Sequence, residues 1–363
     1  AILALTNRPD PKQIIREALG DDVVVLDYVE PGFDLARTMA QAFEENPGKK
    51  GAVWIQHGLI TWGESAQESY ESTIELVNRA ERYLAENRTN PLRVVSRTDP
   101  AIARRRWACV APVLRGLLAG DSGNPDRPYE RIILTPLQSR KILDFVDSDR
   151  GKETALTPPL TTDHLIRTKP LPAWIDDPDF ENPEAFRSQV RSAVEQYREQ
   201  YRKYLERHVA QMDQSLEAFD PTPRVMLIPG LGAACAGRDI REAVICRDIT
   251  AQTLEVKSRI AACGEYRGLE EDRLFAMEYR TLQHAKLNRR EPALGRETAL
   301  VTGAAGAIGS GICRGLLEAG CHVVATDLAG DPLETLVKEL QVDHGDRIMG
   351  VPMDVTDPAS VGK

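Results

Sequence analysis

The first ninety residues combine two hydrophobic periods. Consecutive apolar residues at Val23–Leu26 and Ala52–Ile55 are typical of buried strands. Around these runs, apolar side chains recur every three or four positions on a polar background, which predicts helices. The predicted helices are Pro11–Leu19, Phe33–Phe43 and Ser65–Ala85. This order of elements predicts an α/β domain over residues 1–90.

Residues 91–290 show a less regular pattern. The part up to residue 180 is rich in proline, which indicates irregular connections. From Glu184 to Phe219, apolar residues at three- and four-residue spacing stand on a heavily charged background, which predicts one long surface helix. The other predicted elements are a helix at Ala101–Leu118, strands at Ile132–Leu134 and Arg224–Ile228, and helical segments to about Leu287. We therefore expect a mixed, largely helical middle region.

After a short predicted linker at Glu291–Gly295, strands and helices alternate. A buried strand, a glycine-rich turn, a helix and a second strand that ends at Asp327 follow one another, and a third strand comes later. The predicted elements are Thr298–Val301, Ser310–Ala319, Cys321–Thr326 and Met349–Met353. Strand–helix–strand units form parallel sheets, so residues 296–363 are predicted to form one.

Composition narrows the classes of function. The 363 residues are enough for two or three domains, and 46 Lys+Arg against 55 Asp+Glu give a net charge of −9, which disfavours a nucleic-acid partner. No apolar run approaches the ~18–20 residues of a membrane span, so no membrane partner is expected. The six cysteines form no Cys-x-x-Cys pair, which favours reduced thiols and a cytoplasmic location.

Both ends of the chain look like the interior of a longer polypeptide. Ala1–Leu5 is an apolar run without an initiator methionine, whereas chain termini usually lie in solvent. Asp354–Lys363 has the Asp/Thr and Pro pattern of a helix start. We therefore expect further sequence on both sides.

The turn after the strand Thr298–Val301 carries a pattern for binding a dinucleotide. Glycines permit a tight turn and let backbone N–H groups approach a pyrophosphate at the start of the next helix, whose dipole favours an anion. Asp327 follows roughly twenty residues later, where a carboxylate can accept hydrogen bonds from both ribose hydroxyls. Its charge would repel a 2′-phosphate, so NAD is favoured over NADP. The candidate residues in the turn are Thr302, Gly303, Ala305, Ala307, Ile308 and Gly309.

This turn resembles that of the short-chain dehydrogenase/reductase family, which reads Thr-Gly-x-x-x-Gly-x-Gly. Thr302, Gly303 and Gly309 match the pattern, and Ala307 stands at the middle glycine position. The resemblance covers residues 297–363 and implies the N-terminal half of a Rossmann doubly wound sheet that binds NAD.

The same resemblance gives roles to residues after the third strand. Asp354 and Val355 look like the family's Asp-hydrophobic pair, which contacts the adenine ring. The family's catalytic Ser and Tyr-x-x-x-Lys set does not occur in this sequence. Because that tyrosine is the proton donor of the reaction, we expect no catalytic residue for hydride transfer within this chain.

Trp54–Gly63 is the second informative stretch. His57 comes where a buried strand ends and is followed by Gly58, so its ring is expected to face a pocket. Imidazole is the commonest zinc ligand, although a single histidine is more often a structural residue. The stretch resembles the class II aldolase/adducin family, in which a His-Gly-hydrophobic segment supplies the third zinc ligand.

That resemblance implies two further ligands in a His-x-His pair, which would precede Ala1. Zinc acts in that family as a Lewis acid that polarises the substrate carbonyl during aldol cleavage. A catalytic zinc needs three protein ligands. His57 is thus predicted to be a metal ligand in the whole protein, while the chain as given lacks the full catalytic sets.

Together the two resemblances point to the bifunctional aldolase/short-chain dehydrogenase proteins of bacterial deoxy-sugar catabolism, of the rhamnulose-1-phosphate aldolase/lactaldehyde dehydrogenase type. Thr161–Lys169 and Pro229–Gly232 are also similar to segments of those proteins. The resemblance implies cleavage of a ketose 1-phosphate, NAD-dependent oxidation of a lactaldehyde-like product, small-molecule substrates and a homo-oligomer. The alternative is a non-catalytic, adducin-like protein that binds a dinucleotide in a structural or regulatory role.

Two short segments leave alternatives open. His164, Arg167 and Lys169 place three cationic side chains close together, which suits a phosphate or carboxylate; a solvated loop with ordinary ion pairs is the alternative. Pro229–Gly232 follows a strand and is suited either to cradle an anion or to form a simple turn.

Overall fold

The structure, a computed structural model, describes residues 1–126, 128–213, 215–287 and 292–362, without the side chain of Asp163. The start of the predicted linker, Glu291, and the last residue, Lys363, lie outside the described residues. Contacts divide the chain into two compact units, residues 1–110, 136–234 and 246–287 in the first and 111–135, 235–245 and 288–363 in the second. Among the described residues, we found no helix with the length and apolar character that a membrane crossing requires.

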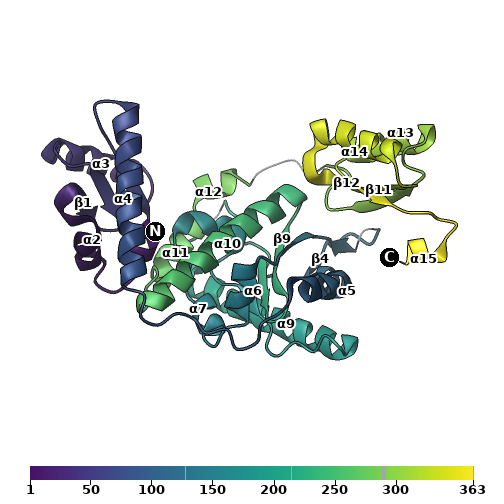
Figure 1. The fold of residues 1–363 in the computed structure, drawn as a ribbon, viewed down its shortest axis with the longest axis horizontal. Helices are drawn as coiled ribbons and strands as arrows, with labels where there is room; N and C mark the ends of the chain where they lie inside the picture. Colours follow the sequence, from purple (N-terminus) through teal and green to yellow (C-terminus); the bar gives the residue numbers. More distant parts are fainter. Residues whose placement is uncertain (127, 214, 288–291, 363) are drawn as a thin grey trace. The chain divides into compact units, whose positions relative to one another are not determined.

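The N-terminal part of the first unit is a small sheet with helices packed around it (Figure 1). Its elements are α1 (Ile2–Thr6), α2 (Pro11–Leu19), β1 (Val23–Leu26), α3 (Phe33–Glu45), β2 (Gly51–Trp54), β3 (Gly58–Thr61) and α4 (Ala66–Glu86). β1 runs parallel to β2, and β3 pairs with β2 in antiparallel fashion. The helices and strands predicted from hydrophobic period are confirmed here. The strand β3 was not predicted. Its turn places Gln56 at φ +59°, and the sequence lacks the Asn or Gly that usually marks a hairpin at such a position.

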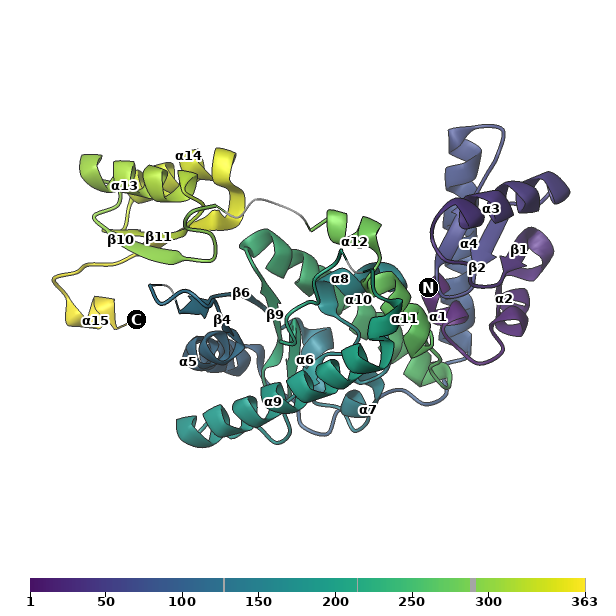
Figure 2. The same cartoon turned by 180° about the vertical axis from the view of Figure 1, so that it is seen from behind.

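The middle of the chain is helical around a four-stranded sheet of order β6-β9-β8-β7. Its helices are α5 (Pro100–Leu118), α6 (Arg140–Val146), α7 (Gly151–Ala155), α8 (Leu165–Thr168), α9 (Pro183–His208), α10 (Ile240–Cys263), α11 (Glu271–Glu278) and α12 (Thr281–Ala285). Its strands are β6 (Ile133–Leu137), β7 (Ala173–Trp174), β8 (Val225–Ile228) and β9 (Gly232–Gly237), and β4 (Gly120–Asp121) pairs with β5 (Tyr129–Glu130) in a separate hairpin. Figure 2 shows the full length of α9.

The predicted long helix ends earlier than its hydrophobic period indicates. α9 ends at His208, not at Phe219. Further along the chain, the Phe219 ring packs on Tyr279 and His284, and its backbone N–H donates to the Tyr279 hydroxyl at 3.2 Å. Phe219 thus makes tertiary contacts outside the helix, so its place in the apolar pattern does not predict helix at this position.

The sequence pattern does not predict β9. Its residues, Gly-Ala-Ala-Cys-Ala-Gly, have low strand propensity, yet all of them are buried. A Cβ at Gly232 would lie 2.4 Å from the carbonyl oxygen of Leu137, and one at Gly237 would lie 2.3 Å from the nitrogen of Ala243. The small residues are therefore needed because neighbouring backbone comes close to this strand.

The C-terminal part of the second unit is a parallel sheet of order β10-β11-β12. Its elements are β10 (Thr298–Thr302), α13 (Ala307–Glu318), β11 (His322–Asp327), α14 (Asp331–His344), β12 (Ile348–Pro352) and α15 (Pro358–Val361). Figures 1 and 2 show α13 and α14 on the same face of this sheet, over a core that includes Val301, Leu317 and Val323. The predicted mixture of helices and sheets is confirmed, and the C-terminal part has the predicted parallel sheet.

Candidate functional site

The carboxyl ends of β10, β11 and β12 meet at one edge of the C-terminal sheet. In the parallel register, Thr302 lies beside Thr326 and Asp327 beside Pro352. The turn after β10 and the loop after β12 therefore leave the sheet at the same edge. The structure brings to this edge the residues predicted to bind the cofactor, which are Thr302, Gly303, Ala305, Ala307, Ile308, Gly309, Asp327, Asp354 and Val355.

Two glycines shape the turn after β10. Gly303 has φ +60°, and a Cβ there would meet no atom within 4 Å, so the space over this residue is open. A Cβ at Gly309 would lie 2.1 Å from the Gly303 carbonyl oxygen, so α13 comes this close only because the position has no side chain. α13 begins at Ala307, and the next side chain, Ile308, is 81% exposed. The turn thus leads directly into an accessible helix N-terminus, which suits an anion.

The backbone holds the carboxylate of Asp327 at the end of β11. Its Oδ2 accepts a hydrogen bond from the N–H of Ala305 in the turn at 2.9 Å, and its Oδ1 accepts one from Leu328 N–H at 2.8 Å. An ionised carboxylate has about four acceptor positions, so two remain for other donors. The side chain is partly exposed, so these positions can reach a ligand.

The loop after β12 has an ordered start. Asp354 accepts hydrogen bonds from the hydroxyl of Thr356 at 2.7 Å and from its N–H at 2.9 Å. The Thr356 hydroxyl bond lowers the pKa of Asp354, and the backbone bond adds to the effect. The neighbouring Val355 side chain is 60% exposed, so this loop offers an apolar surface beside a fixed carboxylate.

His57 lies in the turn between β2 and β3. Its ring packs edge-on against Trp54, with ring centroids 5.7 Å apart, and its backbone N–H donates to the Trp54 carbonyl at 3.2 Å. Gln56 ties the same turn to the Arg267 carbonyl through a 3.2 Å hydrogen bond. Within the described part of the chain, no group of three or more His, Cys, Asp or Glu side chains is placed to hold a metal ion. His57 and its surroundings therefore do not fit a complete zinc site by themselves.

A buried polar cluster lies between α9 and α11 in the first unit. Glu278 is fully buried and accepts hydrogen bonds from the hydroxyls of Tyr201 at 2.7 Å and Tyr204 at 2.9 Å. The Tyr201 hydroxyl also lies 2.8 Å from that of Tyr279. Burial raises the pKa of Glu278 to about 7, although the two tyrosine hydrogen bonds favour its ionised form.

Lys169 joins this cluster from the end of α8. Its side chain is 3% exposed, and its Nζ lies 4.2 Å from the centre of the Tyr201 ring and donates to the Asp220 carbonyl. Burial lowers the pKa of Lys169 to about 7. The alternative of a solvated loop with ordinary ion pairs is therefore wrong for Lys169, whose side chain is buried.

In the turn at Pro229–Gly232, the backbone N–H of Gly230 is already used in a hydrogen bond and cannot bind an anion. The Gly230 N–H donates to the carboxylate of buried Asp147 at 2.8 Å, and its carbonyl accepts a hydrogen bond from Arg106 at 2.9 Å. The simple-turn alternative is confirmed at this position.

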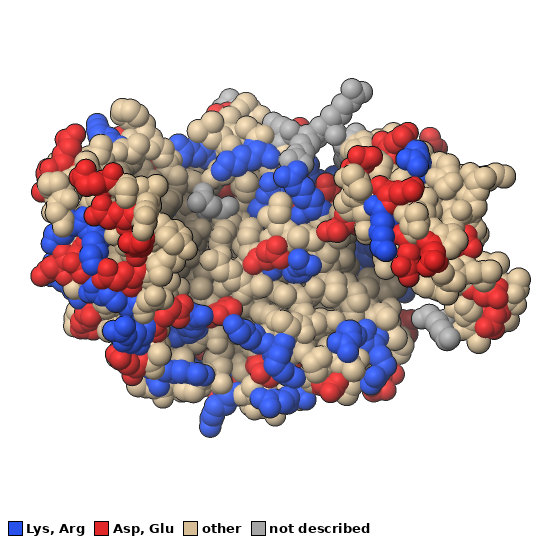
Figure 3. All heavy atoms as spheres, turned by 45° about the horizontal axis from the view of Figure 1, so that its top comes forward, with Lys and Arg blue, Asp and Glu red and all other residues tan. Residues whose placement is uncertain are grey.

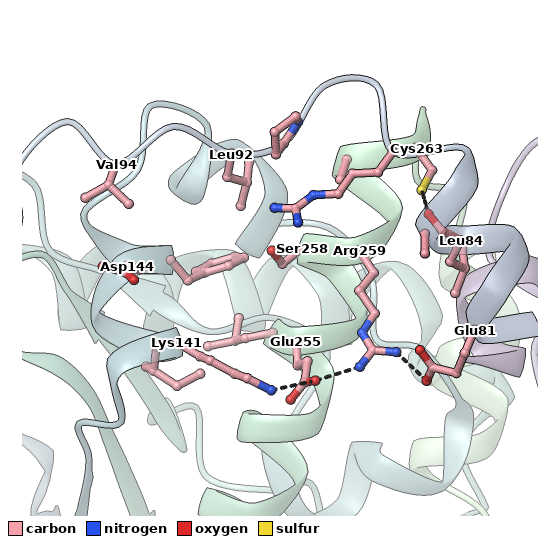
Figure 4. A pocket seen from close by; sticks show the side chains of 17 residues that line it. Glu81, Leu84, Leu92, Val94, Lys141, Asp144, Glu255, Ser258, Arg259 and Cys263 are labelled. Carbon is pink, nitrogen blue, oxygen red and sulfur yellow. Dashed lines mark hydrogen bonds and ion pairs between the residues drawn. The ribbon is translucent and has the colours of Figure 1, made fainter. Parts of the chain in front are cut away.

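A cavity of about 530 Å³ in the first unit lies in the size range of ligand pockets, roughly 300–1,000 Å³. Figure 4 shows Lys141 and Arg259 pointing toward Glu255, and Arg259 also reaching Glu81. Glu255 lies 2.9 Å from Lys141 and 2.8 Å from Arg259, and the Arg259–Glu81 pair is 2.6 Å apart. These charges pair with one another, so they do not mark the cavity as specific for a charged ligand.

Three family models match the chain in order. The class II aldolase and adducin N-terminal domain matches residues 2–84, the second domain of class II aldolases matches residues 105–287, and the short chain dehydrogenase model matches residues 297–363. The chain belongs to the class II aldolase family. It continues into a short-chain dehydrogenase domain, as the resemblances of the His57 stretch and of the glycine turn predict.

Known relatives match either the whole chain or its C-terminal part. The class II aldolase chain is 30% identical over 99% of its length to YuxG, an uncharacterised oxidoreductase of Bacillus subtilis, and covers 52% of that protein. Its C-terminal part is 50% identical to a 1-deoxy-11-beta-hydroxypentalenate dehydrogenase of Streptomyces avermitilis, over 18% of this chain and 23% of that protein. It is also 47% identical to a fluoren-9-ol dehydrogenase of Terrabacter, over 16% of each chain. The chain thus spans about half the length of the relative that it matches throughout.

The two families are families of enzymes that act on small molecules. One chain carries matches to both families, and the relative that matches it throughout is named an oxidoreductase. The N-terminal model is shared by class II aldolases and adducin, so the matches that favour an enzyme over the adducin-like alternative are those of the second aldolase domain and of the dehydrogenase domain.

Sequence reasoning missed the polar cluster of this class II aldolase chain. Tyr201 reads as part of an apolar helix face, and Glu278 as part of a packed segment. The signal was nevertheless present, since a buried tyrosine hydroxyl needs a partner and a carboxylate between Met277 and Tyr279 has to be paired if buried. The sequence does not say which distant partner each group finds.

Proposed function

We propose that this chain is part of a bifunctional enzyme of deoxy-sugar catabolism. Its first unit takes part in zinc-dependent aldol cleavage of a ketose 1-phosphate, of the rhamnulose 1-phosphate type. Residues 296–363 bind the NAD with which the enzyme oxidises the aldehyde product, a lactaldehyde-like compound. The observation that carries the proposal is the open glycine turn beside the carboxylate of Asp327.

The residues at this edge suit each part of NAD. The open space over Gly303 and the N-terminus of α13 suit the pyrophosphate. The free acceptor positions of Asp327 suit the ribose hydroxyls, and Asp354 and Val355 suit the adenine. When bound, NAD supplies the hydride acceptor. The residues of this chain bind and orient it, and we assign none of the described residues a role in hydride transfer itself.

Calorimetric titration of the chain with NAD and NADP tests this assignment. We expect NAD to bind more tightly than NADP, because the Asp327 carboxylate repels a 2′-phosphate. Asp327→Asn should weaken NAD binding by about tenfold, since a hydrogen bond to a charged group contributes roughly 1.5–3 kcal/mol, and should reduce the preference over NADP. Asp346→Asn, at an exposed acid in the short turn before β12, is the matched control and should change neither. Equal affinities of the wild type and Asp327→Asn for NAD would contradict the assignment.

The aldolase part of the proposal rests on His57 at the turn after β2. In the whole protein, His57 would be one zinc ligand, and the other ligands would come from residues outside this chain. Because the described residues do not complete a zinc site, we derive no catalytic step from them. The proposal here is limited to ligand identity and to the class of reaction.

The test uses the whole protein that the gene encodes around this chain. Purified protein is analysed for zinc and assayed for release of dihydroxyacetone phosphate from rhamnulose 1-phosphate. We expect His57→Ala to lower zinc content and cleavage together, while NAD binding is retained. His344→Ala, a change in α14, is the control. Retention of zinc and cleavage by His57→Ala would show that His57 is not a ligand.

Four further expectations belong to the same proposal. The domains are residues 1–90, 91–290 and 296–363, which limited proteolysis can test. The enzyme is cytoplasmic and homo-oligomeric, and the free state of the described cysteines agrees with a reducing compartment. Its partners are small molecules and not nucleic acid, which the net charge of −9 favours. On the face in Figure 3, acidic and basic side chains are interspersed.

A further inference from the structure

A second, smaller cavity in the first unit has two buried lysines in its wall. Its volume is about 40 Å³, which is room for about three water molecules at roughly 10–15 Å³ each. Lys169 comes from the end of α8 and Lys257 from the middle of α10. Ala155, Thr250 and Thr253 also line it, and most of the remaining wall is made of proline, leucine and valine residues.

Lys257 is buried without a counter-charge. Its side chain is 2% exposed, and its Nζ donates to the carbonyls of Thr157 at 2.8 Å and Ala155 at 3.2 Å. The ring of Tyr266 lies 5.3 Å from the same nitrogen. Among the described residues, no carboxylate lies within ion-pair distance of Lys257. Burial alone lowers its pKa to about 7. Burying an ammonium group without a counter-charge raises the free energy of the folded chain. Either loss of the proton or a bound anion would remove this penalty.

Lys169 lines the same cavity and has an unfavourable backbone conformation. It has φ +62° and ψ 175°, a region that glycine alone adopts easily. A lysine is kept in this conformation with its side chain buried. The charged groups that act on it are Asp220 and Glu278, which favour its protonated form, and Arg224 and Arg198, which oppose it. Such strain is typical of a position that a ligand site requires.

The face of α10 that carries Lys257 also carries hydroxyls. Thr250, Thr253 and Lys257 follow at three- and four-residue spacing, so they share one side of the helix. All three line the cavity. The Thr250 hydroxyl donates to the Cys246 carbonyl at 2.7 Å. The donors that the wall offers to an oxyanion are therefore the Thr253 hydroxyl and the lysine ammonium groups.

We propose that the cavity between Lys169 and Lys257 binds a compact oxyanion of the sulfate or phosphate type, which both ammonium groups hold. The size of the cavity admits the anion but not a sugar. The anion therefore enters either as a free inorganic ion or as the terminal phosphate of a larger molecule. This site does not depend on the function proposed above, since it involves neither His57 nor the edge of the C-terminal sheet.

Titration of the full chain with sulfate tests the site directly. Sulfate does not change its protonation near neutral pH, so any protons taken up on binding are taken up by the protein. Calorimetry at pH 8, at constant ionic strength with chloride, is run in two buffers of different ionisation enthalpy. We expect saturable binding of one sulfate per chain with net uptake of protons, because the anion favours the charged form of both lysines. Absence of saturable binding, or binding without proton uptake, would overturn the proposal.

Variants assign the binding to the cavity. Lys257→Met and Lys169→Met should each weaken sulfate binding at least about tenfold, as loss of a charge-assisted contact predicts. Lys203→Met, at an exposed lysine of α9, is the matched control and should bind as the wild type does. Equal affinity in Lys257→Met and wild type would place the anion elsewhere and overturn the proposal. If Lys257→Met does not fold, Lys257→Gln replaces it, and the proton uptake of the wild type remains decisive.

Two further titrations separate the sources of the anion. Inorganic phosphate and glycerol 3-phosphate are compared under the same conditions. Binding of phosphate alone identifies a site for a free ion, whereas equal binding of both identifies a site for a terminal phosphate group. Each of these two results supports the site. If neither phosphate nor glycerol 3-phosphate binds, the site is contradicted.

Discussion

The edge of the C-terminal sheet and the polar cluster of the middle region are built in opposite ways. At the edge, Ala305 and Asp327 are joined across 22 residues of sequence, within one strand–helix–strand unit. In the cluster, Tyr201 and Glu278 are joined across 77 residues and come from different helices. The first arrangement follows from local geometry, since parallel strands end at a common edge. The second depends on how helices pack, so it becomes visible only in the folded chain.

The largest effect should come from removing the shared acceptor of the cluster. Glu278→Ala leaves the hydroxyls of Tyr201 and Tyr204 buried without their partner and opens a void. We expect the free energy of unfolding to fall by about 3–5 kcal/mol, measured by urea denaturation. Glu271→Ala, an exposed acid on the same helix, should cost less than about 1 kcal/mol. Similar losses in the two variants would show that the cluster is not a structural centre of the middle region.

Adding a methyl group at Gly309 tests the glycine turn at the edge of the C-terminal sheet. Its Cβ would meet the Gly303 carbonyl oxygen at 2.1 Å, so the turn or α13 has to shift. We expect Gly309→Ala to destabilise the chain by about 1–3 kcal/mol. Because the same turn is proposed to bind NAD, the affinity for NAD should fall at least about tenfold in calorimetry. Unchanged NAD affinity together with the loss of stability would separate the turn from cofactor binding.

The buried lysine of α10 predicts a dependence of stability on pH. Burial lowers the pKa of Lys257 to about 7 in the folded chain, while the unfolded chain holds this proton up to about pH 10.5. Between these values the unfolded state binds more protons, so Lys257 makes the free energy of unfolding rise with pH, by at most about 1.4 kcal/mol per unit. Lys257→Met removes this contribution.

The measurement is urea denaturation of both proteins between pH 7 and 10, in buffer free of sulfate and phosphate. The advantage of Lys257→Met over the wild type should be largest near pH 7 and shrink as the pH rises. Lys169 is present in both proteins, so its contribution cancels. A difference that stays constant with pH would mean that Lys257 keeps its proton in the folded chain.

The smallest effect has the opposite sign and serves as the control for Gly309. Gly315 lies in the interior of the same helix, is exposed, and a Cβ there would meet nothing within 4 Å. We expect Gly315→Ala to stabilise the chain by about 0.5–1 kcal/mol through helix propensity and to leave NAD affinity unchanged. Thermal unfolding and calorimetry read out the two quantities.

The sequence predicted those parts whose determinants are local. Hydrophobic period was sufficient for α2 and β1, and the glycine turn together with Asp327 was sufficient to assemble one edge of the parallel sheet. It failed where packing decides, as at β9, whose small residues are used because neighbouring backbone lies close to Gly232 and Gly237. It failed likewise beyond the end of α9 at His208, since Phe219 further along the chain packs on distant rings.

The same distinction holds for the candidate sites. Lys169 could be singled out from its cationic neighbours in sequence, but its burial could not. Lys257 carries no local signal at all, because a lysine at this spacing on a helix normally faces solvent. Its role depends on the helix being covered by chain from Ala155 to Thr157, which supplies its two carbonyl partners.

Nuclear magnetic resonance with NAD tests most directly whether the carboxyl edge of the C-terminal sheet is a dinucleotide site. Backbone amide shifts of the full chain are followed during the titration. We predict saturable changes concentrated at residues 302–309, around Asp327 and at Asp354–Val355. Saturable changes centred on the 530 Å³ cavity, or no saturable change in a folded sample, would contradict the claim.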